Sequence, residues 1–130
     1  MDRDFEKYMG GPTEALAERL RVSINRGRAI LLNRNIYHRL GRPEAVLLGY
    51  SRTRDTIAVE PASPRLNESF PVIKNGTNWR INAAPFCRHF NIRIDTPIQF
   101  VQPEIEGTSL YLNLAQVVTV GGWKQRRRNK

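Results

Sequence analysis

The pattern of apolar and polar residues along the chain predicts a mainly β protein with a few short helices. Short apolar runs recur at close intervals, and glycine, proline, asparagine or aspartate separates them. Runs of this length between turn-forming residues favour strands over long helices. The strands predicted in this way span residues 28–33, 45–50, 56–60, 78–82, 97–101 and 109–114.

Two short helices are predicted between these strands, over residues 34–40 and 83–90. Asn33 precedes the first helix, and its side-chain oxygen can accept a hydrogen bond from a free N–H group of the first turn. Gly41 ends this helix because glycine readily adopts the left-handed conformation of a helix C-terminus. In the second helix, Pro85 fits the first turn and Asn91 fits the left-handed C-terminal position.

The two halves of the chain repeat one order of elements: a strand, a short helix and a hairpin. Asn33 and Asn82 end the two first strands, and Tyr37 and Phe86 follow at the same spacing. The second hairpin is expected to join strands 97–101 and 109–114 through a turn containing Gly107. One βαββ unit has little interior and exposed sheet edges, so we expect two tandem units to close into a barrel.

The sequence thus predicts an α+β, mainly β fold in one compact domain, with five parts. These are an N-terminal arm and helix (1–23, the helix running from Pro12 to about Val22 and Ser23), a first βαββ unit (24–60), a proline-rich linker (61–71), a second βαββ unit (72–120) and a basic tail (121–130).

The charge balance is strongly basic. The chain has 21 lysine and arginine residues against 12 acidic ones, a formal net charge of +9, and only four of the basic residues are lysine. A guanidinium binds phosphate or a guanine edge through a rigid fork of donors, so this preference favours a phosphate-bearing partner. A high-GC genome would also raise the proportion of arginine, so the net charge is the stronger argument.

The positive charge is concentrated in two segments. Residues 123–130 carry five positive charges and no acid, which is typical of a nonspecific phosphate-binding tail or of a solvated terminus. The run from Arg19 to Arg42 also lacks acids, and its arginines alternate with apolar residues, which indicates a folded basic patch. The candidate nucleic-acid-binding residues are Arg26, Arg28, Arg34, Arg39, Arg52, Arg54, Arg80, Lys124, Arg126, Arg127 and Arg128.

A family resemblance follows from two short motifs in the first unit. Gly27-Arg28 opens a strand, Leu40-Gly41 ends a short helix, and a hairpin follows. This order resembles the swapped-hairpin transcription factors of the AbrB, SpoVT and MazE type. Two such units in one chain are similar to the tandem, MraZ-like arrangement. The resemblance covers about residues 24–60 and, less closely, 72–114.

The resemblance implies an intertwined β-barrel whose arginines beside the first strand face DNA. Asn25 stands where the family has an acid, and Asn33 stands where it has a proline. Tyr37 and His38 occupy positions at which the family often has arginines that contact DNA. Independently of the family, we expect the loops at one end of the barrel to bring together four arginines: Arg26, Arg28, Arg52 and Arg54.

Catalytic and metal-binding motifs are not found in the sequence. His38, Cys87 and His89 are the only imidazole or thiol groups, and Cys87 and His89 point apart on a predicted helix. We therefore predict no catalytic residue, metal or cofactor, and expect Cys87 to be a buried apolar residue. A nuclease site built from carboxylates at turns is an alternative that the sequence does not exclude. Trp79 and Trp123 are candidates for stacking on bases.

These observations favour a cytoplasmic DNA-binding protein, of the kind that regulates transcription, over an enzyme. No apolar stretch approaches the ~18 residues of a membrane span, the first residues lack a signal-peptide pattern, and one cysteine fits a reducing compartment. The expected partners are duplex DNA and further copies of the chain. Two alternatives stay open: an oligomeric structural or adaptor protein without a specific nucleic-acid site, and an RNA-binding protein.

Overall fold

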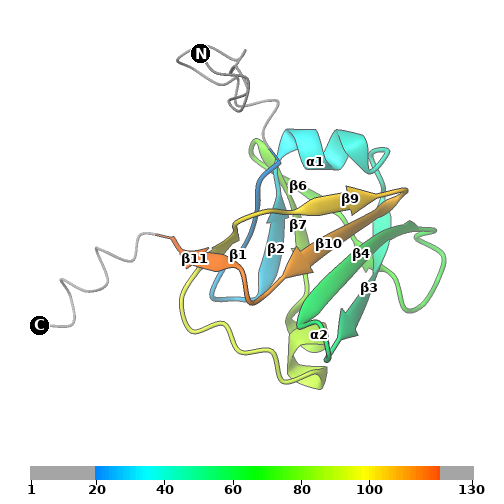
Figure 1. Cartoon of the computed structure of the whole chain (residues 1–130). Helices are drawn as coiled ribbons and strands as arrows, with labels where there is room; N and C mark the ends of the chain where they lie inside the picture. The colour runs from blue at the N-terminus through cyan, green and yellow to red at the C-terminus, as the bar shows by residue number, and fades with distance from the viewer. Residues whose placement is uncertain (1–19, 121–130) are drawn as a thin grey trace, which may run out of the picture.

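Short antiparallel strands are the main regular elements of the chain that the computed structural model describes, which is residues 20–120 (Figure 1). The six-stranded sheet contains β1 (Val22–Ile24), β2 (Ala29–Leu32), β6 (Ile73–Asn75), β7 (Asn78–Asn82), β8 (Ile98–Phe100) and β11 (Val117–Thr119). The five-stranded sheet contains β3 (Ala45–Ser51), β4 (Thr56–Ala62), β5 (Phe70–Pro71), β9 (Glu104–Glu106) and β10 (Ser109–Asn113). The predicted mainly β class is confirmed.

Both sheets combine strands from the two halves of the chain. The strand order is β11-β8-β1-β2-β7-β6 in the larger sheet and β5-β3-β4-β10-β9 in the smaller one. In the larger sheet, β2 of the first half pairs with β7 of the second. In the smaller sheet, β4 pairs with β10. Neither half therefore forms a complete sheet by itself.

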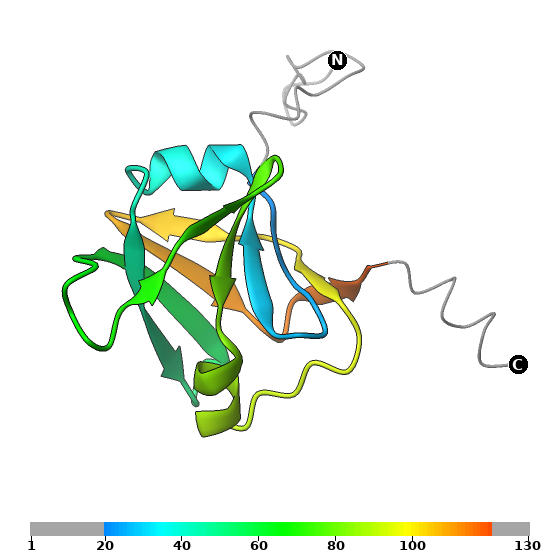
Figure 2. The ribbon, with the colours of Figure 1, turned by 180° about the vertical axis from the view of Figure 1, so that it is seen from behind.

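Two helices of six residues lie at opposite ends of the sheets (Figures 1 and 2). Helix α1 (Arg34–Arg39) begins after Asn33, whose Oδ1 accepts a hydrogen bond of 3.2 Å from the Ile36 N–H. Helix α2 (Ala84–His89) has no side-chain hydrogen bond at its N-terminus. The residues after the helix C-caps, Gly41 and Asn91, both have positive φ, of 86° and 56°. The predicted helices and their C-terminal signals are confirmed.

The core lies between the two sheets and is closed by the helices. Inward side chains of the larger sheet, such as Ile30 and Ile81, pack with inward side chains of the smaller sheet, such as Ile57 and Leu112. Cys87 on α2 is fully buried in the same cluster, as expected from the sequence. Burial at alternate strand positions leaves one face of each sheet toward solvent.

Two of the predicted elements are wrong. The helix expected to end near Val22 and Ser23 does not reach these residues, because they form β1; its earlier part lies outside the described residues. The second hairpin is formed by β9 and β10 rather than by residues 97–101 and 109–114. Strand β8 joins the other sheet, where it pairs with β1 and β11.

The predicted linker is shorter than expected, because β4 extends through Ala62 and β5 occupies Phe70–Pro71. Among residues 20–120, no helix has the length and apolar character needed to cross a membrane.

Candidate nucleic-acid interface

The outer face of the six-stranded sheet is built from a continuous row of side chains that crosses every strand. Residues directly opposite each other on neighbouring strands share a face. The pairing register gives the row Val118, Gln99, Ser23, Leu31, Arg80 and Ile73. Ala29 is paired with Asn82 in the next row. This face carries arginine, amide, hydroxyl and apolar side chains, and its described residues include no acid.

The outer face of the five-stranded sheet has the opposite charge, and we call it the acidic face. Glu60 pairs with Leu47, and the Ser109 hydroxyl contacts the Glu60 carboxylate at 3.5 Å. Glu106 pairs with Ser109, and Glu104 pairs with Tyr111. All three glutamates are exposed. The strands of the two sheets therefore carry ionisable side chains of different sign on their outer faces.

The turn between β1 and β2 adjoins the larger sheet and carries Arg26 and Arg28. The Asn25 side chain closes the turn by accepting a hydrogen bond of 2.9 Å from the Ala29 N–H. Arg28 adopts a left-handed conformation with φ of 65°, which is uncommon for a residue other than glycine. Its carbonyl accepts a hydrogen bond of 3.1 Å from Ala83 N–H, so this turn lies at the α2 end.

Arg28 and Arg80 share an unusual feature. Both side chains are half-buried, and in each the Nε atom is buried without a hydrogen-bond partner within the described chain. A buried guanidinium nitrogen left unpaired is costly, so such a group is expected to serve a purpose other than stability. The outer face of the six-stranded sheet with the β1–β2 turn, carrying Arg21, Arg26, Arg28 and Arg80, is called the basic face below.

The β3–β4 turn lies at the same end of the molecule, and its two arginines, Arg52 and Arg54, contact different parts of the fold. The Arg52 guanidinium lies over the Phe90 ring, 5.6 Å from its centroid, at the C-terminus of α2. Arg54 lines a depression together with Glu104 and Glu106 of the acidic face. The expected cluster of four arginines is thus divided, because Arg54 lies with the glutamates and away from Arg26 and Arg28.

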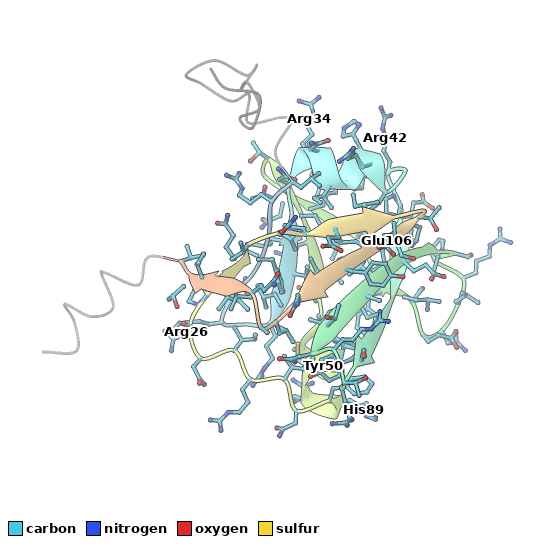
Figure 3. All side chains as sticks on the ribbon, viewed as in Figure 1. Arg26, Arg34, Arg42, Tyr50, His89 and Glu106 are labelled. Carbon is cyan, nitrogen blue, oxygen red and sulfur yellow. The ribbon has the colours of Figure 1, made fainter. Side chains whose placement is uncertain are left out.

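Arg34 and Arg39 lie on α1, at the end opposite the β1–β2 turn, and both are exposed. Figure 3 shows Arg34 on α1 and Arg42 just beyond the end of this helix, on the opposite side of the molecule from Arg26. The Arg42 Nε donates a hydrogen bond of 3.3 Å to His38 Nδ1. These arginines form a second positive region at the α1 end of the molecule.

Trp79 is less available for base stacking than the sequence suggested. The Tyr37 ring stacks on it with centroids 4.1 Å apart and an interplanar angle of 8°. The Lys74 ammonium also lies over the Trp79 ring, 4.8 Å from its centroid. A base could stack on Trp79 only by displacing one of these groups. Trp123 lies outside the described residues, as do Lys124, Arg126, Arg127 and Arg128.

Arg21 was not singled out from the sequence as a contact residue. It precedes β1, is exposed, and accepts a hydrogen bond of 3.1 Å at its carbonyl from Asn33 N–H. By alternation from Ser23 its side chain belongs to the outer face of the larger sheet. A strand assignment for residues 22–24 would have revealed it. Arg88 and Arg93, also unpredicted, are exposed near α2, and Arg93 lies 4.0 Å from Asp95.

The Cys87 thiol belongs to the hydrophobic core. Burial raises the pKa of the Cys87 thiol, while the nearby positive charges of Arg28 and Arg88 act in the opposite direction. Across residues 20–120, no three histidine, cysteine, aspartate or glutamate side chains lie close enough to hold a metal ion. No family model, curated protein or solved structure matches this chain.

Proposed function

We propose that this protein binds duplex DNA through its basic face and acts as a transcriptional regulator. The observation that carries the proposal is the separation of charge between the two sheets. The outer face of the larger sheet and its adjoining turn carry Arg21, Arg26, Arg28 and Arg80 without an acid, whereas Glu60, Glu104 and Glu106 lie on the other sheet. The strands of the larger sheet and the β1–β2 turn therefore place no carboxylate on the basic face itself.

The dimensions and groups of this face suit a nucleic-acid backbone. Six strands about 4.8 Å apart span about 24 Å, enough to cross a major groove of about 12 Å and the phosphates on both sides. Guanidinium groups bind phosphate in a bidentate manner, and four arginines contribute such groups to the basic face. Ser23, Gln99 and Asn82 add neutral donors beside them.

The proposal includes an architecture of two tandem βαββ units that close into a swapped-hairpin-like barrel. The pairing of β2 with β7 and of β4 with β10 supports it, since each central pair joins corresponding strands of the two halves. The positive φ of both Gly41 and Asn91 after the two helices also supports it. In this arrangement Leu31 and Arg80 are corresponding residues and lie opposite each other. Of the four arginines of the basic face, Arg26 and Arg28 belong to the first unit and Arg80 to the second.

The proposal is tested by single charge reversals in the full chain. Arg26→Glu and Arg28→Glu are expected to weaken binding to a fluorescent duplex at least about tenfold each, because each replaces a phosphate contact with repulsion. Arg65→Glu, at an exposed site between β4 and β5, makes the same charge change away from this face and serves as the control. Equal effects of all three variants would reduce the binding to net charge and refute the proposed site.

Competition distinguishes the alternatives. Unlabelled duplex DNA is expected to displace the labelled duplex more effectively than single-stranded RNA of the same length. Stronger displacement by the RNA would make this an RNA-binding protein. A full chain that binds neither at physiological salt would favour a structural or adaptor role.

A further inference from the structure

The four sheet edges of the described chain differ in how they are protected against pairing with another strand. Native proteins protect edges with charged residues or proline, because unpaired backbone groups otherwise recruit a further strand. Strand β6 carries Lys74, β9 carries Glu104 and Glu106, and β5 contains Pro71. Strand β11, with the sequence Val-Val-Thr, has neither a charge nor a proline.

The surface around β11 is also the uncharged part of a strongly basic chain. Neither residues 97–101 nor residues 114–120 include a charged side chain. Three of the exposed large apolar residues lie here: Val101 is 60% exposed, Val118 is 54% exposed and Val120 is 44% exposed. Since each chain has a formal net charge of +9, two copies repel each other at long range. Two copies that meet at residues 97–101 and 114–120 do not place like charges of these segments in contact.

Within residues 20–120, the backbone groups of β11 divide into those that bond β8 and those that point away from it. Val120 N–H donates to the Pro97 carbonyl and Val101 N–H donates to the Gln116 carbonyl, both at 2.9 Å. In an antiparallel pair, residues that exchange hydrogen bonds alternate with residues whose N–H and C=O groups point away. Val117 and Thr119 therefore direct their backbone groups to the open side of β11.

We propose that β11 pairs antiparallel with β11 of a second copy of this chain, with Val118 opposite Val118. Identical strands pair in this way about a two-fold axis, and the same apolar side chain then meets itself. Val117 of each copy exchanges hydrogen bonds with Thr119 of the other. The two larger sheets become one continuous sheet, so the outer faces of both copies lie side by side.

The contact is small. Two strands of three residues bury far less than the ~1,200–2,000 Å² of a stable interface, so the dimer is weak and needs to be trapped. The Val118 residues form a pair without mutual backbone hydrogen bonds, for which the Cα atoms lie about 4.5 Å apart. This separation is within the range that a disulfide bridges.

Cross-linking of the full-length Val118→Cys variant tests the pairing, and it requires no nucleic acid, so its outcome is independent of the proposed function. The native Cys87 is buried and gives little background. Ile73→Cys is the matched control, because Ile73 is exposed on the same face at the opposite edge, β6. Under mild oxidation, Val118→Cys is expected to form disulfide dimers at least about tenfold faster than Ile73→Cys.

A second variant tests the same register by repulsion. Val118→Lys places two positive charges opposite each other. It is therefore expected to abolish the concentration-dependent association that the proposal predicts for the wild-type chain in sedimentation experiments, while Ile73→Lys leaves it intact. Equal cross-linking rates for the two cysteine variants, or association that survives Val118→Lys, would overturn the proposal.

Discussion

Leu31 in β2 lies directly opposite Arg80 in β7 on the outer face of the six-stranded sheet. An apolar side chain thus faces a half-buried arginine at the junction of the two halves of the chain. The Nε of this arginine is buried and has no hydrogen-bond partner among residues 20–120. The basic face is consequently uneven, since the two halves place different side chains at this central position.

Replacing this arginine is expected to separate stability from binding. Arg80→Leu removes the unpaired Nε and places leucine beside Leu31 and Ile73, so the free energy of unfolding should rise by about 1 kcal/mol. Duplex affinity should fall about five- to tenfold, because one phosphate contact is lost. Urea unfolding and fluorescence anisotropy measure the two quantities. The double variant Leu31→Arg with Arg80→Leu should recover most of the affinity, and its failure to do so would contradict a contact at this position.

The two helix starts give a matched pair of stability predictions. Asn33→Ala removes the side-chain acceptor for the Ile36 N–H and should lower the free energy of unfolding by about 1 kcal/mol. Asn82→Ala is the control, since α2 begins without a side-chain hydrogen bond and Asn82 is exposed. Urea titrations that gave the same loss for both variants would refute a specific capping role for Asn33.

The left-handed conformation of Gly41 makes a second stability prediction. With φ of 86°, Gly41→Ala is expected to cost about 1 kcal/mol even though a Cβ atom would meet no neighbour within 4 Å. Gly49→Ala, in β3 with equal space and no positive φ, should leave stability unchanged or raise it slightly. Thermal unfolding of the two variants distinguishes backbone strain from a shortage of space, because only strain makes Gly41 the sensitive position.

The Tyr50–Asp55 pair predicts a loss of stability at high pH. The Tyr50 hydroxyl donates a hydrogen bond of 2.6 Å to Asp55 Oδ1, and this bond is the main reason that the pKa of Tyr50 is raised above its ordinary value of 10.0. The folded protein therefore holds this proton more tightly than the unfolded chain does. The contribution to stability is complete below pH 10.0 and declines as the pH rises beyond that value.

Urea unfolding of the wild-type protein and of Tyr50→Phe over this pH range measures the effect. The wild-type advantage should shrink above pH 10.0. A difference between the two proteins that stays constant across the range would exclude the hydrogen bond as its source.

The parts of the fold that local chemistry determines were predictable from the sequence. Asn33, Gly41 and Asn91 mark helix ends because their side chains or backbone preferences act within one turn of the chain. Strand β9 was missed because Glu104 and Glu106 flank a single apolar residue, Ile105, so the alternation is too short to recognise.

The arrangement of the arginines could not be predicted in the same way. Which charges share a face depends on the pairing of β2 with β7 and of β1 with β8, which join segments far apart in the chain. The sequence therefore grouped Arg54 with Arg26 and Arg28, whereas the folded chain places it beside Glu104 and Glu106. It also omitted Arg21, because the strand that orients this residue is only three residues long.

The salt dependence of duplex binding by a chain that lacks residues 123–130 is the most direct test of the central claim. Without the five positive charges of that segment, four arginines of the basic face should still give a linear plot of log K against log salt concentration, with a slope of about −3 to −4. Adding Arg26→Glu and Arg28→Glu to this shortened chain should abolish measurable binding. A shortened chain that no longer binds duplex at low salt, or one whose affinity survives both reversals, would contradict the assignment of DNA binding to this face.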